Sequence, residues 1–180
     1  MSVLVPAIQI PLDRLVTIKQ SLAGRLQAIV QASSTGTAGQ EIIYRDLLAA
    51  DVAVTATTGR VNSGTLSATT LASNVFSTFT LTSFQALGIY GYAALSPNPQ
   101  IDEIDFTVSG NVVLAKFTLD PLYCLQQSVG YFVDPIIWNP QETVGVNLLS
   151  QAGVTNEQFC LIGYMAEPAG RTVAPRTSAA

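Results

Sequence analysis

The chain has 180 residues, of which 48% are hydrophobic and only 11% are charged. A typical domain carries about 25% charged residues, so this composition excludes a disordered charged tail and fits one domain with a sizeable core. The net charge is −4 and the eight Lys and Arg residues are scattered, which argues against sequence-specific nucleic-acid binding. No apolar run approaches the ~20 residues that span a bilayer, and Pro6 and Pro11 interrupt the region where a signal peptide needs a continuous apolar core.

The first predicted element is an amphipathic helix from Leu12 to Val30. Its apolar residues recur every three or four positions, as one helix face requires: Leu15, Ile18, Leu22, Leu26 and Ile29. Pro11 suits the helix start and Asp13 the positive end of the helix dipole. This face predicts packing on the chain's own domain or on a partner's helix. The flanking charges Arg14, Lys19 and Arg25 leave open an anionic membrane surface.

The segment after this helix, 33–39, has the composition of a flexible linker. A second short helical or irregular piece is expected over Glu41–Ala50. The period then changes to two, which predicts strands through Val52, Val54 and Ala56 and through Val75–Phe84. Leu87–Leu95 reads as a strand buried on both faces, with glycines where another backbone or a large ring approaches.

The second half of the chain predicts plainer strands. Ile104–Val108 and Val112–Leu119 form a hairpin around Ser109-Gly110-Asn111. Three more strands follow at Tyr131–Trp138, Thr143–Leu149 and Gln158–Ala166, with turns at 139–142 and 150–156, and Val144, Val146 and Leu148 share one face.

This layout predicts a mainly β fold: an antiparallel two-sheet sandwich of about eight strands, jelly-roll-like, preceded by one α-helix. The expected organisation is an N-terminal arm, helix and linker over 1–40, a β-sandwich domain over 41–168 and an extended C-terminal tail over 169–180. So few charges indicate a surface covered by partner subunits, or else a monomer with a neutral, Thr-rich exterior.

The sequence offers little for catalysis. It contains no histidine, which removes His-dependent nucleophilic systems and the commonest general base near neutral pH. Its two cysteines, Cys124 and Cys160, are too few for a Cys-only metal site; buried thiols and a disulfide both remain open. Gly36-Thr37-Ala38-Gly39 lacks the Lys and the spacing of a phosphate-binding loop.

Carboxylates and one aromatic segment are the remaining candidates for a site. Asp102, Glu103 and Asp105 form the densest acidic cluster, which a solvated strand entry explains better than calcium binding, because the D-x-D-x-D-G pattern is missing. A glycosidase would need two acids in one cleft, and the further acids are Asp120, Asp134, Glu142 and Glu167. Trp138, near Tyr131 and Phe132, is a candidate sugar platform, although core or interface packing is the commoner role of such a run. We therefore expect no catalytic, cofactor or metal residues.

The order of these parts resembles single jelly-roll capsid proteins of icosahedral viruses, including tailless double-stranded DNA phages with an internal membrane. The segments that carry the resemblance are Leu87–Leu95, Ile104–Leu119, Tyr131–Trp138, Thr143–Ser150 and Phe159–Glu167. Adhesin domains and other β-sandwiches share the layout.

The resemblance implies a non-enzymatic structural protein of the virion. Its partners would be further copies of itself and other capsid proteins, with internal membrane contact through the N-terminal helix as one option. The chain lacks a strongly basic N-terminal arm, which argues against direct genome packaging. The alternative from another class is a non-catalytic carbohydrate-binding or adhesive module.

Overall fold

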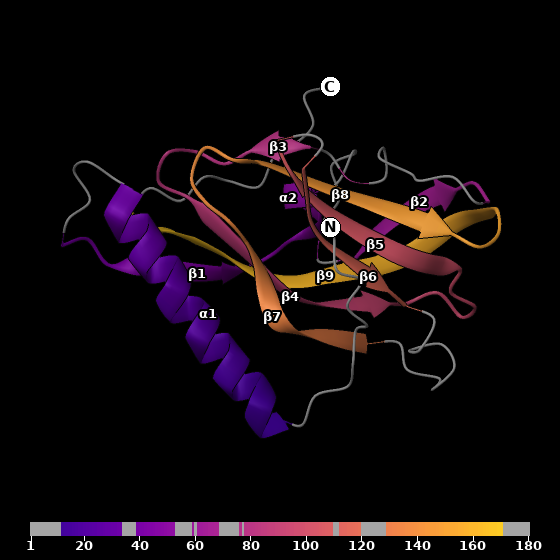
Figure 1. The fold of residues 1–180 in the computed structure, drawn as a ribbon, viewed down its shortest axis with the longest axis horizontal. Coiled ribbons are helices and arrows are strands. Elements are labelled where there is room, and N and C mark those ends of the chain that lie inside the picture. The colour runs from indigo at the N-terminus through magenta and orange to yellow at the C-terminus, as the bar shows by residue number, and fades with distance from the viewer. Residues whose placement is uncertain are drawn as a thin grey trace.

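The structure is a computed structural model, and it describes residues 12–33, 39–52, 59, 61–68, 76, 78–109, 112–119 and 129–170. These residues form one long helix, one short helix and two antiparallel sheets (Figure 1). The elements are α1 (Leu12–Ser33), β1 (Ile42–Asp46), α2 (Ala49–Val52), β2 (Asn62–Leu66), β3 (Phe79–Thr80), β4 (Ala86–Ala94), β5 (Ile101–Val108), β6 (Val112–Thr118), β7 (Val129–Trp138), β8 (Thr143–Ser150) and β9 (Val154–Pro168).

The strands pair in a nested order around the turn after β5. The four nested pairs are β5 with β6, β4 with β7, β3 with β8 and β1 with β9. Successive pairs alternate between the two sheets, which gives the orders β1-β9-β4-β7 and β3-β8-β5-β6, with β2 beside β9. A long hairpin wound into two facing sheets in this way is the jelly-roll arrangement. The predicted β-sandwich with an N-terminal helix is therefore confirmed.

Aromatic side chains fill the space between the two sheets. Phe106 of β5 meets the rings of Phe117, Phe132 and Trp138 edge-on, a favourable geometry for aromatic pairs. The Phe117 and Phe132 rings stack with centroids 3.9 Å apart, so β6 and β7 face each other at one end of the sandwich. Val144, Val146 and Leu148 of β8 lie in the same core, as their alternation predicts.

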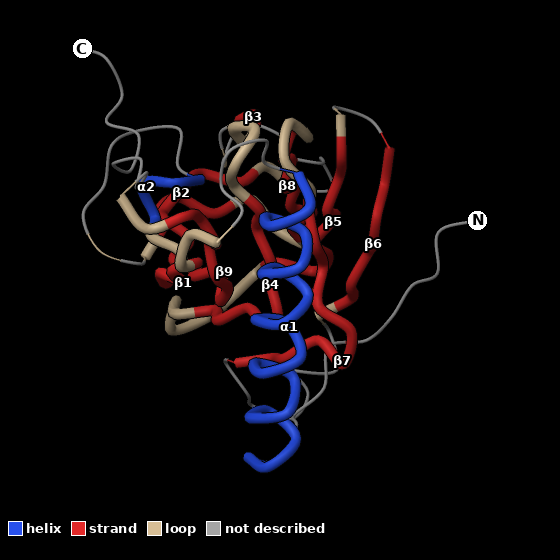
Figure 2. The backbone as a smooth tube through the Cα atoms, turned by 90° about the vertical axis from the view of Figure 1, so that its left-hand side faces the viewer, coloured by secondary structure: helices blue, strands red, loops and turns tan. Residues whose placement is uncertain are grey.

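Helix α1 covers the outer face of the sheet that contains β4 (Figure 2). Its buried residues pack on Ile42, Ala86, Tyr90 and Ala166, and they are Leu15, Ile18, Leu22, Leu26 and Val30. Ile29, which the periodicity placed on this face, is only half-buried. The apolar stripe thus lies on the chain's own sheet. No helix among the described residues is long and apolar enough to cross a membrane.

Because β4 lies between the core and α1, all nine of its residues are buried. Two glycines in it make room for neighbours, as predicted for Leu87–Leu95. A Cβ on Gly88 would lie 2.5 Å from a terminal methyl of Leu22 on α1, and one on Gly91 would lie 2.8 Å from the Tyr131 ring. These glycines therefore let the helix and the neighbouring strand approach the sheet closely.

Other strand predictions also hold. The hairpin is β5 and β6, and the three closing strands are β7, β8 and a longer β9. The predicted helix is α1, which ends three residues later at Ser33. These segments carry either clear alternation or long apolar runs, the patterns that tertiary context overrides least.

Three sequence predictions were wrong. The piece over Glu41–Ala50 contains strand β1 before α2, because Ile42–Asp46 pairs with the end of β9. Val52 ends α2 instead of starting a strand, and the Val75–Phe84 strand is reduced to Phe79–Thr80 within its described part. Strand β2, with the polar sequence NSGTL, was missed. Several predicted segments and residues lie outside the described residues: the N-terminal arm through Pro11, most of the 33–39 linker, positions 53–58, Asp120, Cys124 and the tail from Arg171.

Candidate interaction surface

Strand β6 carries the longest run of exposed apolar side chains in the described part of the chain. Val112, Val113 and Leu114 are 60%, 39% and 43% exposed. Strand β6 is the last strand of its sheet, and β5 is its only neighbour among the described strands. We call residues 112–114 on this free edge the β6 patch. Contiguous exposed apolar residues on an edge strand are typical of interaction surfaces.

A bulge shapes this edge. The β5–β6 register shifts between Phe106, opposite Ala115, and Thr107, opposite Val113. Leu114 is therefore the extra residue of β6, and such bulges bend the strand and redirect side chains. The turn before β6 contains Ser109 with φ of 52°, a left-handed conformation that suits a tight reversal.

At this end of the sandwich, the edge strand of the other sheet is β7, and it is protected against pairing with other chains. Strand β7 departs from regular pairing with β4 at residues 132–135, where Pro135 cannot donate a backbone hydrogen bond. Asp134 is 86% exposed in its side chain and forms an ion pair with Arg25 of α1 at 3.0 Å. Irregular pairing, proline and charge are the devices that keep edge strands from pairing with other chains. The β6 patch has the bulge but neither proline nor charge.

Next to this patch, the residues of the predicted acidic cluster contact two different partners. Lys116 Nζ contacts Glu103 at 2.6 Å and Asp105 at 3.5 Å. Asp102 instead accepts a hydrogen bond from Gln151. Burial raises the pKa of the Asp105 carboxyl, although Lys116 opposes this. The hydrogen bond to Glu103 raises the pKa of Lys116. Among the residues described, no three carboxylate or cysteine side chains gather as a metal site would require.

The other carboxylates considered for catalysis also have separate partners. Asp134 binds Arg25. Glu142 accepts hydrogen bonds from the backbone and side chain of Asn139, which closes the β7–β8 turn. Glu167 is fully buried at the end of β9. Of the carboxylates considered for catalysis, only Asp102, Glu103 and Asp105 are close together in sequence. Lys116 forms ion pairs with two of them, Glu103 and Asp105.

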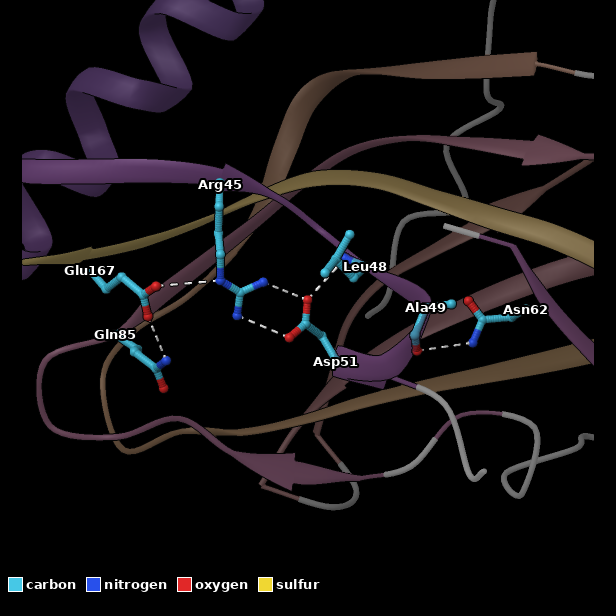
Figure 3. Close-up of polar contacts among 7 residues, drawn as sticks. All are labelled: Arg45, Leu48, Ala49, Asp51, Asn62, Gln85 and Glu167. Carbon is cyan, nitrogen blue, oxygen red and sulfur yellow. Dashed lines mark hydrogen bonds and ion pairs between the residues drawn. The ribbon is translucent and has the colours of Figure 1, made fainter. Parts of the chain in front are cut away.

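A buried polar network, which sequence reasoning missed, surrounds Glu167 (Figure 3). Arg45 of β1 binds Asp51 of α2 through two nitrogens, at 2.7 and 2.9 Å, and donates to Glu167 at 3.3 Å. Gln85 donates to the second Glu167 oxygen. Burial alone would lower the pKa of Arg45, but its bonds with Asp51 and Glu167 raise it. Arg45 and Asp51 are six residues apart, but Gln85 and Glu167 are distant from them and from each other in sequence, so no local pattern indicates the whole network.

Glu157 is a second buried carboxylate on β9, and it forms no ion pair with any residue that the structure describes. One oxygen accepts a 3.4 Å hydrogen bond from the Gln100 backbone, and the other has no hydrogen-bond partner within the described part of the chain. Burial raises the pKa of this carboxyl, and the bonds with Gln100 and Ser96 only partly offset the effect. The group adds a pH dependence to stability.

The aromatic segment proposed as a sugar platform points inward. Trp138 and Phe132 are buried in the core, and the Trp138 indole donates to the Thr107 carbonyl at 2.9 Å. Tyr131 is half-buried and stacks beside Tyr90 near α1. Trp138 therefore presents no face on which a sugar could stack. Cys160 is half-buried on β9, and its thiol contacts the Leu161 carbonyl.

No protein-family model and no curated protein matches this chain.

One sequence signal for the β6 patch was present, because the stretch Val-Val-Leu-Ala at 112–115 does not alternate between apolar and polar residues. Such a strand is normally covered on both faces. The free edge itself was not predictable, because it depends on which strand ends the sheet.

Proposed function

We propose that this protein is a non-catalytic structural subunit that assembles with copies of itself into the icosahedral shell of a virion. The carrying observation is the β6 patch, an uncharged apolar edge on a sandwich whose surface is poor in charge. Other capsid proteins would be further partners. Internal membrane contact through α1 would use its polar face, because its apolar face is covered.

The strand order supports this proposal by analogy. Jelly rolls of two four-stranded sheets recur in viral capsid domains, lectins and cupins. Fold-level analogy alone does not establish a function, so the side chains must discriminate. Trp138 is buried and cannot serve as the aromatic platform of a lectin-like site, and the sequence has no histidine for a metal centre that depends on it.

The internal pairing of polar groups also supports a structural role. Lys116 is paired with Glu103 and Asp105, and Arg45 with Asp51 and Glu167. Active sites usually hold charged groups ready for a substrate. Here these charges connect elements of the fold to one another.

The test is the assembly state of the full chain. Mass photometry over a wide concentration range, with negative-stain electron microscopy, should find closed particles far larger than the 19.0 kDa monomer. A monomer that persists at every concentration would overturn the proposal. Binding to an oligosaccharide array tests the adhesive alternative, and specific glycan binding by a monomer would favour that alternative.

A further inference from the structure

We propose that Glu157 is a proton-dependent latch that holds the loop 95–100 against one end of the sandwich. This loop joins β4 to β5 and therefore passes from one sheet to the other. The structure describes 78–109 and 129–170 without a gap, so the loop and the strand that it binds are both described throughout. The latch goes beyond the proposed function, because it would act in the same way in a monomer and in a shell subunit.

The loop is bound to β9 through backbone and side-chain groups. The Leu95 amide donates to the Gln158 carbonyl at 2.8 Å, and the Gln158 amide donates to the Ser96 hydroxyl at 2.7 Å. The Gln100 amide donates to the Glu157 carboxyl at 3.4 Å. The two prolines of the loop have no amide proton, so they cannot add a backbone donor of their own.

Gln100 connects the two sheets at this end of the sandwich. Its amide binds Glu157 of β9, and its carbonyl accepts from the Ser150 hydroxyl at 3.0 Å and from the Gln151 amide at 2.9 Å. Ser150 is the last residue of β8, which belongs to the other sheet. The Glu157 carboxyl is therefore one of the groups through which β9 is linked to β8.

The Glu157 carboxyl is poorly stabilised as an anion. It is fully buried, and its second oxygen has no hydrogen-bond partner in the part of the chain that the structure describes. At 3.4 Å, the bond from Gln100 is long for a hydrogen bond to a charged group. Burial raises the pKa of this carboxyl, and the contacts with Gln100 and Ser96 lower it by less. The closed loop thus favours the neutral carboxylic acid.

The described residues next to Glu157 supply no positive charge. The neighbouring segments 62–68, 95–101 and 150–156 contain no charged or titratable side chain. The titratable residues beyond them on the adjoining strands carry carboxyl, phenol and thiol groups, which cannot supply a positive charge either: Asp102, Tyr92 and Cys160. Because a buried carboxylate without a cation is unfavourable, the ionised group gains most from contact with water.

The strand pairing beside Glu157 is irregular, which makes local opening easier. The β2–β9 register shifts directly beyond the Gly64–Glu157 pair, and Asn156 has a left-handed φ of 67°. The closed loop keeps the Glu157 proton to higher pH than an open loop, in which the carboxyl meets water. As pH rises above the ordinary value of 4.5, opening therefore becomes more favourable. The latch is closed at low pH and released as pH rises.

Hydrogen exchange at individual backbone amides, corrected for the intrinsic effect of pH, tests the latch in the full chain. Between about pH 5 and about pH 8, we expect the protection of the Leu95 and Gln100 amides to fall by about ten-fold or more. The Ile104 amide, in the middle of β5 between two paired strands, should lose less protection. An equal loss at all three amides would mean that pH acts on global stability alone, and it would overturn the latch.

Glu157→Gln identifies the group responsible, and Glu41→Gln, at an exposed position, is its matched control. Glutamine keeps an oxygen for the Gln100 amide but carries no charge at any pH, so the protection of the loop should no longer depend on pH. Glu41→Gln should keep the wild-type dependence. A pH dependence that persists in Glu157→Gln would overturn the latch. Carbon-13 NMR titration of the wild-type Glu157 carboxyl is an independent check, and a midpoint at or below 4.5 would also overturn it.

Discussion

Gly163 of β9 pairs with Ile89 of β4, next to the shift in register between Ile89 and Gly91. A Cβ at this position would lie 2.3 Å from the Gly88 carbonyl oxygen and 3.1 Å from the Ile89 Cα. Both are backbone atoms of a buried central strand, so they cannot move aside as a side-chain end can. The close approach of β4 and β9 therefore requires glycine here.

We expect Gly163→Ala to lower the free energy of unfolding by about 1–3 kcal/mol through overpacking. Gly24→Ala is the matched control, because Gly24 has nothing within 4 Å on the exposed face of α1. It should stabilise the protein by about 0.5–1 kcal/mol, the usual gain for alanine over glycine inside a helix. Urea unfolding measures both, and a loss at Gly24 would contradict the account.

Arg45 provides a second prediction for a single residue. Arg45→Met would leave Asp51 and Glu167 buried without their cation, and breaking a buried pair in this way typically costs about 3–5 kcal/mol. Arg25→Met, which removes the exposed pair with Asp134, should cost less than about 1 kcal/mol. Chemical denaturation of both variants checks the difference, and similar losses would show that the network contributes little.

Glu157 and Asp105 give stability a pH dependence. Burial raises the pKa of each carboxyl, so the folded state holds these protons to higher pH than the unfolded chain. The free energy of unfolding then falls as pH rises above the ordinary carboxyl values of 3.8 and 4.5. We expect Glu157→Gln to be more stable than the wild type at about pH 8 and to lose part of that advantage at about pH 5.

Urea unfolding at both pH values measures this effect. Glu41→Gln, at an exposed position, is the control and should track the wild type. A Glu157→Gln variant that is less stable than the wild type at the higher pH would mean that the carboxylate has a favourable partner in the fold.

At the scale of elements, α1 and its sheet form a cluster of their own beside the sandwich core. Four tyrosines surround this contact. Tyr44 donates to the Ala23 carbonyl of α1, and Lys19 lies over the Tyr90 ring. Tyr131 and Tyr164 flank Tyr90 on the neighbouring strands. Burial and a bond with Tyr164 raise the pKa of Tyr90. The helix is thus held by both apolar and polar contacts.

Leu26→Ala tests how strongly this helix is bound. Leu26 is fully buried under the helix, so its truncation should cost about 2–5 kcal/mol. Val16→Ala, on the exposed face of the same helix, should change stability by less than about 0.5 kcal/mol. Thermal and urea unfolding provide the measurement. A small effect at Leu26 would mean that α1 is only loosely attached to the sheet.

Elements with strong local patterns were predictable, and those made by pairing were not. The stripe of α1 and the alternation of β5 and β8 appear in the sequence because each buries one face. Strand β2, by contrast, has only Leu66 as a large apolar residue and exists through its pairing with β9. Strand β1 was also assigned wrongly, because it likewise depends on its pairing with β9. The polar clusters depend on the fold to bring distant residues together.

At the scale of the whole molecule, the low charge and the apolar β6 edge make one prediction about solution conditions. If the contact between copies is apolar, raising the salt concentration from about 0.1 M to about 1 M should not weaken assembly, because only charge pairs are screened. Light scattering at the two concentrations tests this. Dissociation at high salt would indicate that ion pairs, and not the β6 patch, hold the copies together.

The sequence by itself determined the fold class, the N-terminal amphipathic helix and most of the strands, because burial of one face leaves a period of 3.6 or 2 in the chain. Its low charge and lack of histidine also limited the chemistry from the start. Only the tertiary structure decided that α1 lies on its own sheet and that Trp138 is in the core. It also decided which strand ends each sheet. Strand order depends on contacts between distant segments, so the position of β6 at the edge of its sheet has no local signature in the sequence.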